Sequence, residues 1–240
     1  MFNFLINPSK FIKFADIIFK PLMLISLIVV IVGLILVYLS PLDYQQGLTV
    51  KIMYIHVPSA WLALLTYTIM TLYSIIGIAF KMPFSFIVNK AVAPIGAVFT
   101  ILCLISGSLW GKPMWGTWWV WDARLTSVLV LFFFYIGYII FLKSFSDFTK
   151  GEKFSSILSI IGIVNLPIIK FSVDYWNTLH QPASISKFSS PSIHIDMLIP
   201  LIVMFLSFLF LFLYILILRF QAELIIRKIN INNMKFYKDS

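Results

Sequence analysis

The sequence predicts an all-α integral membrane protein that crosses the bilayer six times and forms a single domain over residues 1–240. Of these residues, 61% are hydrophobic and only 11% are charged, whereas a soluble domain carries about 25% charged residues. The mean hydropathy is +1.00. The chain also contains six separate apolar stretches, each near the roughly 20 residues that a helix needs to cross a bilayer. These observations exclude an ordinary soluble fold and predict that membrane lipid surrounds the protein.

The first twenty residues carry an amphipathic pattern. Phe11, Phe14, Ala15 and Ile18 share one helical face, and most of the neighbouring lysines lie elsewhere. This pattern predicts a short helix that lies on the membrane surface. The segment lacks a short apolar core followed by a cleavage site of small residues, so we predict no signal peptide.

The six spanning helices follow in one continuous domain. Asn165 and Pro167 predict a kink in the fifth span. No span holds a charged residue in its interior, which argues against an ion-coupled transporter of ordinary design. The predicted spans cover residues 21–40, 57–80, 91–110, 124–142, 154–172 and 197–218.

The basic residues are divided unequally between the two sides of these spans. Thirteen of the 18 lysines and arginines lie on the side that carries both termini. The positive-inside rule therefore predicts that both termini face the cytoplasm, or the matrix of a mitochondrion. The net charge of +9 is spread in small groups beside apolar spans. We therefore predict no binding of nucleic acid.

A tryptophan-rich segment at residues 110–126 lies between the third and fourth spans, on the outer side. It reads WGKPMWGTWWVWDARLT and holds five of the seven tryptophans. Because two glycines and a proline interrupt any helical period, we predict a loop or a shallow re-entrant segment. Trp61 and Trp176 map to the same side. An anchoring belt would place tryptophans at both interfaces, so the one-sided distribution favours a binding surface.

Two histidines flank this segment on the same outer side. His56 lies in MYIHVPSAW and His180 in YWNTLHQPAS. Indole rings stack on flat apolar ligands, and histidine is among the commonest axial ligands of haem iron. We therefore hypothesise that the outer surface binds haem without a covalent bond, with both histidines as axial ligands of the iron. The rings of the tryptophan-rich segment would form the flat apolar wall for the porphyrin.

Several of these residues also have a purely structural interpretation. Asp122 fits the N-cap of the fourth span. Arg124 fits an interfacial anchor, or it could pair with a haem propionate together with Lys112. The single cysteine, Cys103, is expected to be a small buried residue. Since the sequence contains no C-x-x-C-H motif, the chain cannot hold haem by thioether bonds. We assign no role to His194.

The motifs WGTWWVWDARLT at 115–126, YIHVPSAW at 54–61 and WNTLHQP at 176–182 resemble those of a known family. They are similar to the WWD signature and the flanking histidine motifs of the CcmC family, the haem exporter or haem lyase of cytochrome c maturation. The similarity extends from the first span to the last. His56 and His180 match the positions of the family's axial ligands. The resemblance also implies the residues of a haem platform, because the family's signature matches Trp115, Trp118, Trp119 and Trp121, followed by Asp122 and Arg124.

This resemblance implies haem b, bound transiently at the outer face of the bacterial cytoplasmic (inner) membrane or of the mitochondrial inner membrane. In a bacterium the site would be periplasmic. The resemblance also implies delivery of haem to the chaperone CcmE, with the ABC-type subunits CcmA and CcmB and the small subunit CcmD as partners. The only enzymatic step that the resemblance implies is the attachment of haem to a histidine of the chaperone. Two alternatives stay open: a transporter that moves haem across the bilayer, and a scaffold that binds no haem.

Overall fold

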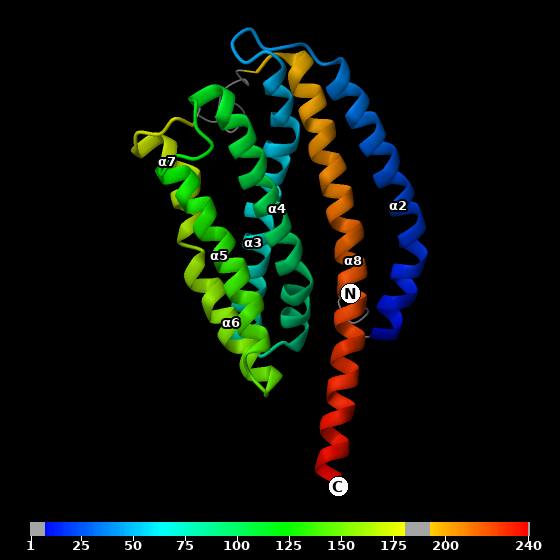
Figure 1. Cartoon of the computed structure of the whole chain (residues 1–240). Coiled ribbons are helices and arrows are strands. Elements are labelled where there is room, and N and C mark those ends of the chain that lie inside the picture. The colour runs from blue at the N-terminus through cyan, green and yellow to red at the C-terminus, as the bar shows by residue number, and fades with distance from the viewer. Residues whose placement is uncertain (1–7, 181–192, 240) are drawn as a thin grey trace.

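The computed structural model describes residues 8–180 and 193–239. Within these ranges, six helical segments are long and apolar enough to cross a membrane, and this confirms the predicted fold class (Figure 1). The elements in chain order are α2 (Pro8–Leu39), η1 (Leu48–Ile52), α3 (Met53–Ala79), α4 (Pro83–Trp115), α5 (Ala123–Lys143), α6 (Phe148–Gly162), α7 (Asn165–Tyr175) and α8 (Ile195–Asp239).

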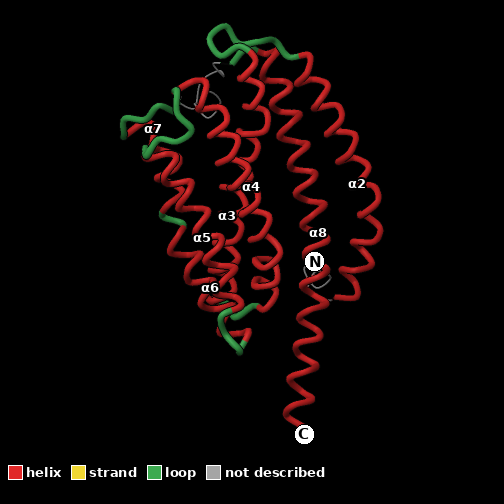
Figure 2. The backbone as a smooth tube through the Cα atoms, in the orientation of Figure 1, coloured by secondary structure: helices red, strands yellow, loops and turns green. Residues whose placement is uncertain are grey.

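The bundle has two distinct ends. We call the end that carries the 40–52, 116–122 and 176–180 segments the tryptophan end, and the opposite end the termini end. Figure 2 shows that the loops gather at these two ends, apart from one short interruption between α6 and α7. The tip of α8 projects beyond the other helices at the termini end (Figure 1). Most helices exceed the predicted spans. At 1.5 Å per residue, the 33 residues of α4 rise about 50 Å, more than the roughly 30 Å of a hydrocarbon core.

The prediction of a separate surface helix at the N-terminus is wrong. The chain forms one continuous helix, α2, which passes through Pro21 without a break. The apolar face that suggested lipid contact packs instead on protein. Phe11 and Ala15 are buried against Phe220 and Leu224 of α8 and against α4. An amphipathic face shows that a segment has a partner, but its periodicity does not distinguish a lipid surface from another helix.

The kink predicted in the fifth span is confirmed. Helix α6 ends at Gly162, a two-residue turn follows, and α7 begins at Asn165. The Asn165 side-chain amide donates a hydrogen bond to the Ser127 carbonyl of α5 at 2.8 Å. This bond holds the broken span against its neighbour, where an amide without a partner would be costly.

The helix core combines apolar packing with hydrogen bonds that some of its buried hydroxyl groups make between helices. Tyr135 of α5 donates to the Ala63 carbonyl of α3 at 2.7 Å, and its hydroxyl lies 2.7 Å from that of Thr66. Ser207 of α8 donates to the Val29 carbonyl of α2 at 2.9 Å. Helices in lipid gain little from hydrophobic association alone, so such bonds and close packing hold the bundle together.

Candidate functional site

The tryptophan-rich segment is largely helical, contrary to the predicted loop. Helix α4 continues through Gly111 and Pro113 and ends at Trp115. Its C-cap is Gly116, which has a φ of 77° and donates its N–H to the Lys112 carbonyl at 3.0 Å. Only the 116–122 stretch is loop, and Asp122 then caps α5. A proline near the end of a helix removes only one backbone hydrogen bond. A glycine in the left-handed conformation ends the helix.

Gly111 contributes space rather than a turn. A Cβ atom at this position would lie 2.8 Å from the indole ring of Trp115, four residues further along the helix. The missing side chain therefore lets the Trp115 ring lie back over the helix. The Trp115 ring centre lies 6.3 Å from that of His180. This packing brings one predicted platform residue beside one predicted axial ligand.

His56 lies in the first turn of α3, with 9% of its surface exposed. Its Nδ1 atom is 3.0 Å from the Cys103 carbonyl and 3.1 Å from the Ser106 hydroxyl of α4. A carbonyl oxygen can only accept, so Nδ1 carries the proton and donates it. The Nε2 atom then keeps its lone pair. This is the arrangement of a metal-ligating histidine, in which a backbone carbonyl orients the ring and sets the tautomer.

His56 precedes the tryptophan-rich segment in the sequence and His180 follows it, and the structure brings the two histidines together. Their ring centres lie 6.2 Å apart, and the rings are tilted by 33°. Zinc keeps roughly 2.0–2.1 Å from an imidazole nitrogen. The two rings are therefore close enough to be ligands of one metal ion, and both histidines remain candidates to hold the iron of haem.

The predicted platform divides into two parts. Trp115 lies beside His180, as described. Trp119 and Trp121 pack edge to face at 5.6 Å, and Trp118 and Trp121 are 53% and 76% exposed. Trp118 and Trp121 therefore present their rings at the surface of the loop, whereas Trp119 is only partly exposed. They line a different part of the end of the bundle, suited to contact with a ligand edge or another molecule.

An apolar groove of about 400 Å³ lies directly below this loop, between α4 and α5. Trp118 and Trp119 form its upper rim, and residues such as Leu104, Leu109 and Phe132 line the rest. The Trp119 indole N–H is buried, and none of the residues that the structure describes accepts a hydrogen bond from it. A flat apolar molecule with an acceptor at its edge suits this combination.

The charged residues of the segment have defined structural contacts. Asp122 is 8% exposed, and its Oδ1 accepts from the Leu125 N–H at 2.8 Å, as predicted for an N-cap. Its Oδ2 is buried without a partner. Arg124 donates to the Ser172 hydroxyl at 3.0 Å and to the Lys170 carbonyl at 3.2 Å. Arg124 therefore joins α5 to α7.

Lys112 stabilises the loop from within. Its ammonium group donates to the Gly116 carbonyl at 2.9 Å and lies 5.9 Å from the centre of the Trp118 ring. The side chain stays exposed, so both contacts leave it accessible to a carboxylate.

Sequence reasoning missed several residues that hold the site. Trp110 packs against His56 with ring centres 5.8 Å apart, and its indole N–H donates to the Gln46 side chain at 2.8 Å. Cys103 contributes its backbone carbonyl rather than its thiol. A helical period continued through the tryptophans would have found this group, because positions 103, 106, 107 and 110 share one face.

We expect Gly107→Ala to weaken haem binding. A Cβ atom at this position would lie 2.9 Å from the His56 Cε1 atom, and the ring cannot retreat without losing its Nδ1 bonds. Overpacking of this kind costs about 1–3 kcal/mol, and a cost of that size in binding corresponds to a loss of roughly 5- to 150-fold in haem affinity. Haem titration of the purified protein would measure it.

Gly137→Ala is the matched control. The added methyl group would face only the flexible end of Leu158, at 3.0 Å. The control should bind haem like the unchanged protein. Equal haem affinity in both variants would contradict the positioning role of Gly107.

Comparison with known proteins places the chain in a family. Residues 1–235 match the family model described as "Heme exporter protein C". The chain is similar to heme exporter protein C of Bradyrhizobium diazoefficiens, with 44% identity over 94% of this chain and 86% of the relative. It is 51% identical to a ccmC-like mitochondrial cytochrome c biosynthesis protein of Marchantia polymorpha, over 72% of this chain and 73% of the relative. Heme exporter protein C of Escherichia coli K12 is 52% identical over 59% of this chain and 58% of the relative. The chain therefore belongs to the heme exporter protein C (CcmC) family of multi-pass membrane proteins.

Proposed function

We propose that this protein holds haem at the tryptophan end, between His56 and His180, and presents it to the haem chaperone CcmE during cytochrome c biogenesis. The paired histidine rings carry this proposal. Their separation of 6.2 Å is short enough for both to be ligands of one iron ion, and the hydrogen bond from Nδ1 of His56 leaves its Nε2 lone pair free for the metal.

Each part of the site would make a separate contribution. The two histidines would hold the iron, and Trp110 and Trp115 would keep the histidine rings in place. Lys112 is the accessible cation that suits a propionate, while Arg124 is engaged with α7. The groove rimmed by Trp118 and Trp119 offers apolar surface for the porphyrin edge. Because every contact is non-covalent, a chaperone can remove the haem.

The arrangement also suits a role in presentation rather than hydrolysis or redox catalysis. The exposed rings of Trp118 and Trp121 lie at the surface where a partner would approach. Holding haem and an incoming histidine in one geometry is a proximity effect, and it needs no general acid or base from this chain. We place this end in the periplasm, or in the mitochondrial intermembrane space, from the distribution of basic residues. CcmA, CcmB and CcmD are the proposed assembly partners.

Transfer of haem between purified proteins tests this function. The chain is loaded with haem in detergent and mixed with the soluble domain of CcmE, and haem on the chaperone is measured after separation. We expect transfer from the unchanged protein and little from His180→Ala, whereas His194→Ala serves as the control.

Two other results would favour the alternative functions. Passage of haem into vesicles that contain only this chain would favour transport across the bilayer. Capture of the chaperone by haem-free protein, with no haem bound at any concentration, would favour a scaffold.

A further inference from the structure

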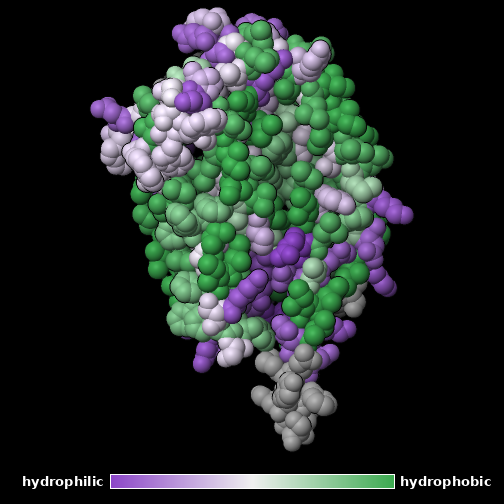
Figure 3. Space-filling model, in the orientation of Figure 1, coloured by the Kyte–Doolittle hydropathy of each residue, from purple (hydrophilic) through white to green (hydrophobic). Residues whose placement is uncertain are grey.

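A second cavity lies at the termini end, far from the histidines. It is an open groove of about 460 Å³ between the start of α4 and the cytoplasmic part of α8. Figure 3 shows hydrophilic side chains gathered in the lower part of this face, with hydrophobic side chains on both sides. The lining residues are Lys81, Met82, Pro83, Phe84, Ile87, Leu224, Arg227, Lys228, Ile231 and Asn232.

The charge of this groove is entirely positive. Lys81, Arg227 and Lys228 line it, and none of its lining residues is acidic. Glu152, which is not among the lining residues, already pairs with Arg227 at 2.7 Å and with Lys90 at 2.8 Å. One carboxylate therefore faces two cations, and the region keeps an excess of positive charge. The pairing with Glu152 also holds Arg227 in a defined position, with its remaining N–H groups available for a ligand.

The start of α4 adds a further attraction for an anion. Its N-cap, Met82, makes no side-chain capping bond, and Pro83 follows at the first helical position. Pro83 has no N–H, and the Ser85 N–H donates to the Met82 carbonyl at 3.1 Å, so the first turn adds the positive end of the helix dipole beside the three cations.

Lys81 occupies an unusual backbone conformation beside this groove. Its φ is 51°, and no other described residue except glycine has a positive φ. A side chain in this left-handed region costs roughly 1–2 kcal/mol, which glycine would avoid. This conformation places the ammonium group of a lysine, rather than a glycine, at the connection beside the groove.

The apolar part of the lining identifies the class of ligand. Ile87 and Leu224 are buried at the base of the groove, next to Phe84. A small soluble anion would need the cations but not this apolar wall. A phospholipid needs both, because its phosphate carries the charge and its glycerol and acyl chains are apolar. Basic pockets between helices on the cytoplasmic side bind anionic headgroups in this way.

We propose that this groove binds an anionic phospholipid of the cytoplasmic leaflet. The phosphate lies among Lys81, Arg227, Lys228 and the start of α4, and the chains follow the apolar wall. The lipid joins the α3–α4 connection to α8, so it stabilises the termini end of the bundle.

Thermal unfolding of the full chain in detergent tests this site. Phosphatidylglycerol or phosphatidylcholine is added to identical samples. We expect phosphatidylglycerol to raise the Tm by about 5 °C or more over phosphatidylcholine. The double variant Lys81→Gly/Lys228→Gln should lose at least half of that rise. Since Lys81→Gly also relieves the left-handed backbone, this variant should still fold.

The control removes the same number of charges from the same end. Lys143 and Lys153 are exposed and lie outside the groove, so Lys143→Gln/Lys153→Gln should keep the full rise in Tm. Equal losses in the two double variants would show a general charge effect and overturn the proposal. A rise of the same size with inorganic phosphate alone would overturn the assignment to a lipid.

Discussion

Replacing either His56 or His180 by alanine is expected to abolish the low-spin visible spectrum of bound haem. Each variant removes one of two rings whose centres lie 6.2 Å apart, so the iron would lose one axial ligand. Removing a residue that only orients a metal ligand by a hydrogen bond typically lowers metal affinity 10–100-fold. Because each variant here removes a ligand itself, haem affinity should fall by at least about tenfold. Absorption spectra of the purified, haem-titrated proteins would measure both effects.

Two further samples separate ligation from damage to the fold. His194→Ala removes the third histidine, whose side chain is 70% exposed at the start of α8, and it should leave the spectrum unchanged. Free imidazole added to His56→Gly should restore a low-spin spectrum, because the small ligand can occupy the vacated space. Unchanged spectra in both the His56 and the His180 variant would refute bis-histidine ligation.

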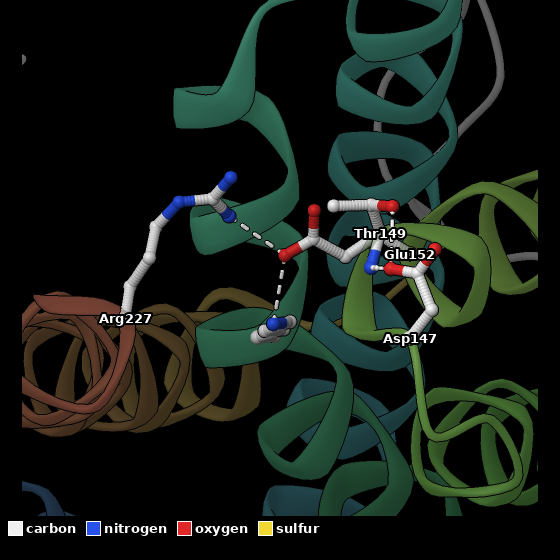
Figure 4. Close-up of polar contacts among 5 residues, drawn as sticks. Asp147, Thr149, Glu152 and Arg227 are labelled. Carbon is white, nitrogen blue, oxygen red and sulfur yellow. Dashed lines mark hydrogen bonds and ion pairs between the residues drawn. The ribbon is translucent and has the colours of Figure 1, made fainter. Parts of the chain in front are cut away.

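The second large effect is expected from Glu152, the buried carboxylate at the termini end. It is 2% exposed and accepts from Lys90 of α4 and Arg227 of α8, which approach it from different helices (Figure 4). Replacement by alanine would leave two cations without their shared partner. Breaking a buried ion pair on one side costs about 3–5 kcal/mol. Unfolding of the purified protein by increasing amounts of sodium dodecyl sulfate would measure this loss.

A second ion pair and a triple variant test the cause of that loss. Glu223 bonds the partly exposed Arg219 at 3.0 Å within one turn of α8, and a pair of this kind contributes about 0.2–0.5 kcal/mol. Glu223→Gln should therefore have little effect. Replacing Lys90, Glu152 and Arg227 together by Met, Leu and Met should recover most of the stability, because no buried charge is then unpaired. An equal loss in Glu152→Ala and Glu223→Gln would contradict the importance of burial.

The neighbouring carboxylate shows why burial decides this difference. Asp147 precedes the same helix, α6, and accepts from the N–H and the hydroxyl of Thr149 at 2.9 and 2.6 Å (Figure 4). The hydrogen bond from the Thr149 hydroxyl is the main cause that lowers the pKa of the Asp147 carboxyl. Asp147 is exposed, so water can replace these hydrogen bonds if they are lost. Glu152 is buried, so water cannot replace the groups that pair with it.

Several features of the site were available from the sequence. The one-sided tryptophans and the two outer histidines pointed to a shared surface, and the structure brings His56 and His180 together. The N-cap role of Asp122 was also predicted correctly. The Gln181–Pro182 part of the second histidine motif lies outside the described residues. These predictions depended on residue type and on the side of the membrane, which both follow from local sequence.

The end of α4 could not be predicted from the sequence in this way. Gly111 and Pro113 suggested a break, yet the helix continues to Trp115 because the Trp115 ring packs over Gly111. Helix propensity is a weak local preference that packing overrides. Cys103, Ser106, Gly107 and Trp110 lie within the predicted third span and share one helical face, but only the packing of α3 against α4 shows that this face meets His56.

The sequence by itself determined the class of the protein, its six spans, the break at Asn165 and the grouping of the aromatic and histidine residues at one end of the spans. Hydrophobicity and charge act locally, so they can be read along the chain. Only the tertiary structure decided which groups meet. The bond between His56 and the Cys103 carbonyl joins positions 47 residues apart, and that between Glu152 and Arg227 joins positions 75 residues apart. Such contacts depend on how whole helices pack, and no local pattern contains that information.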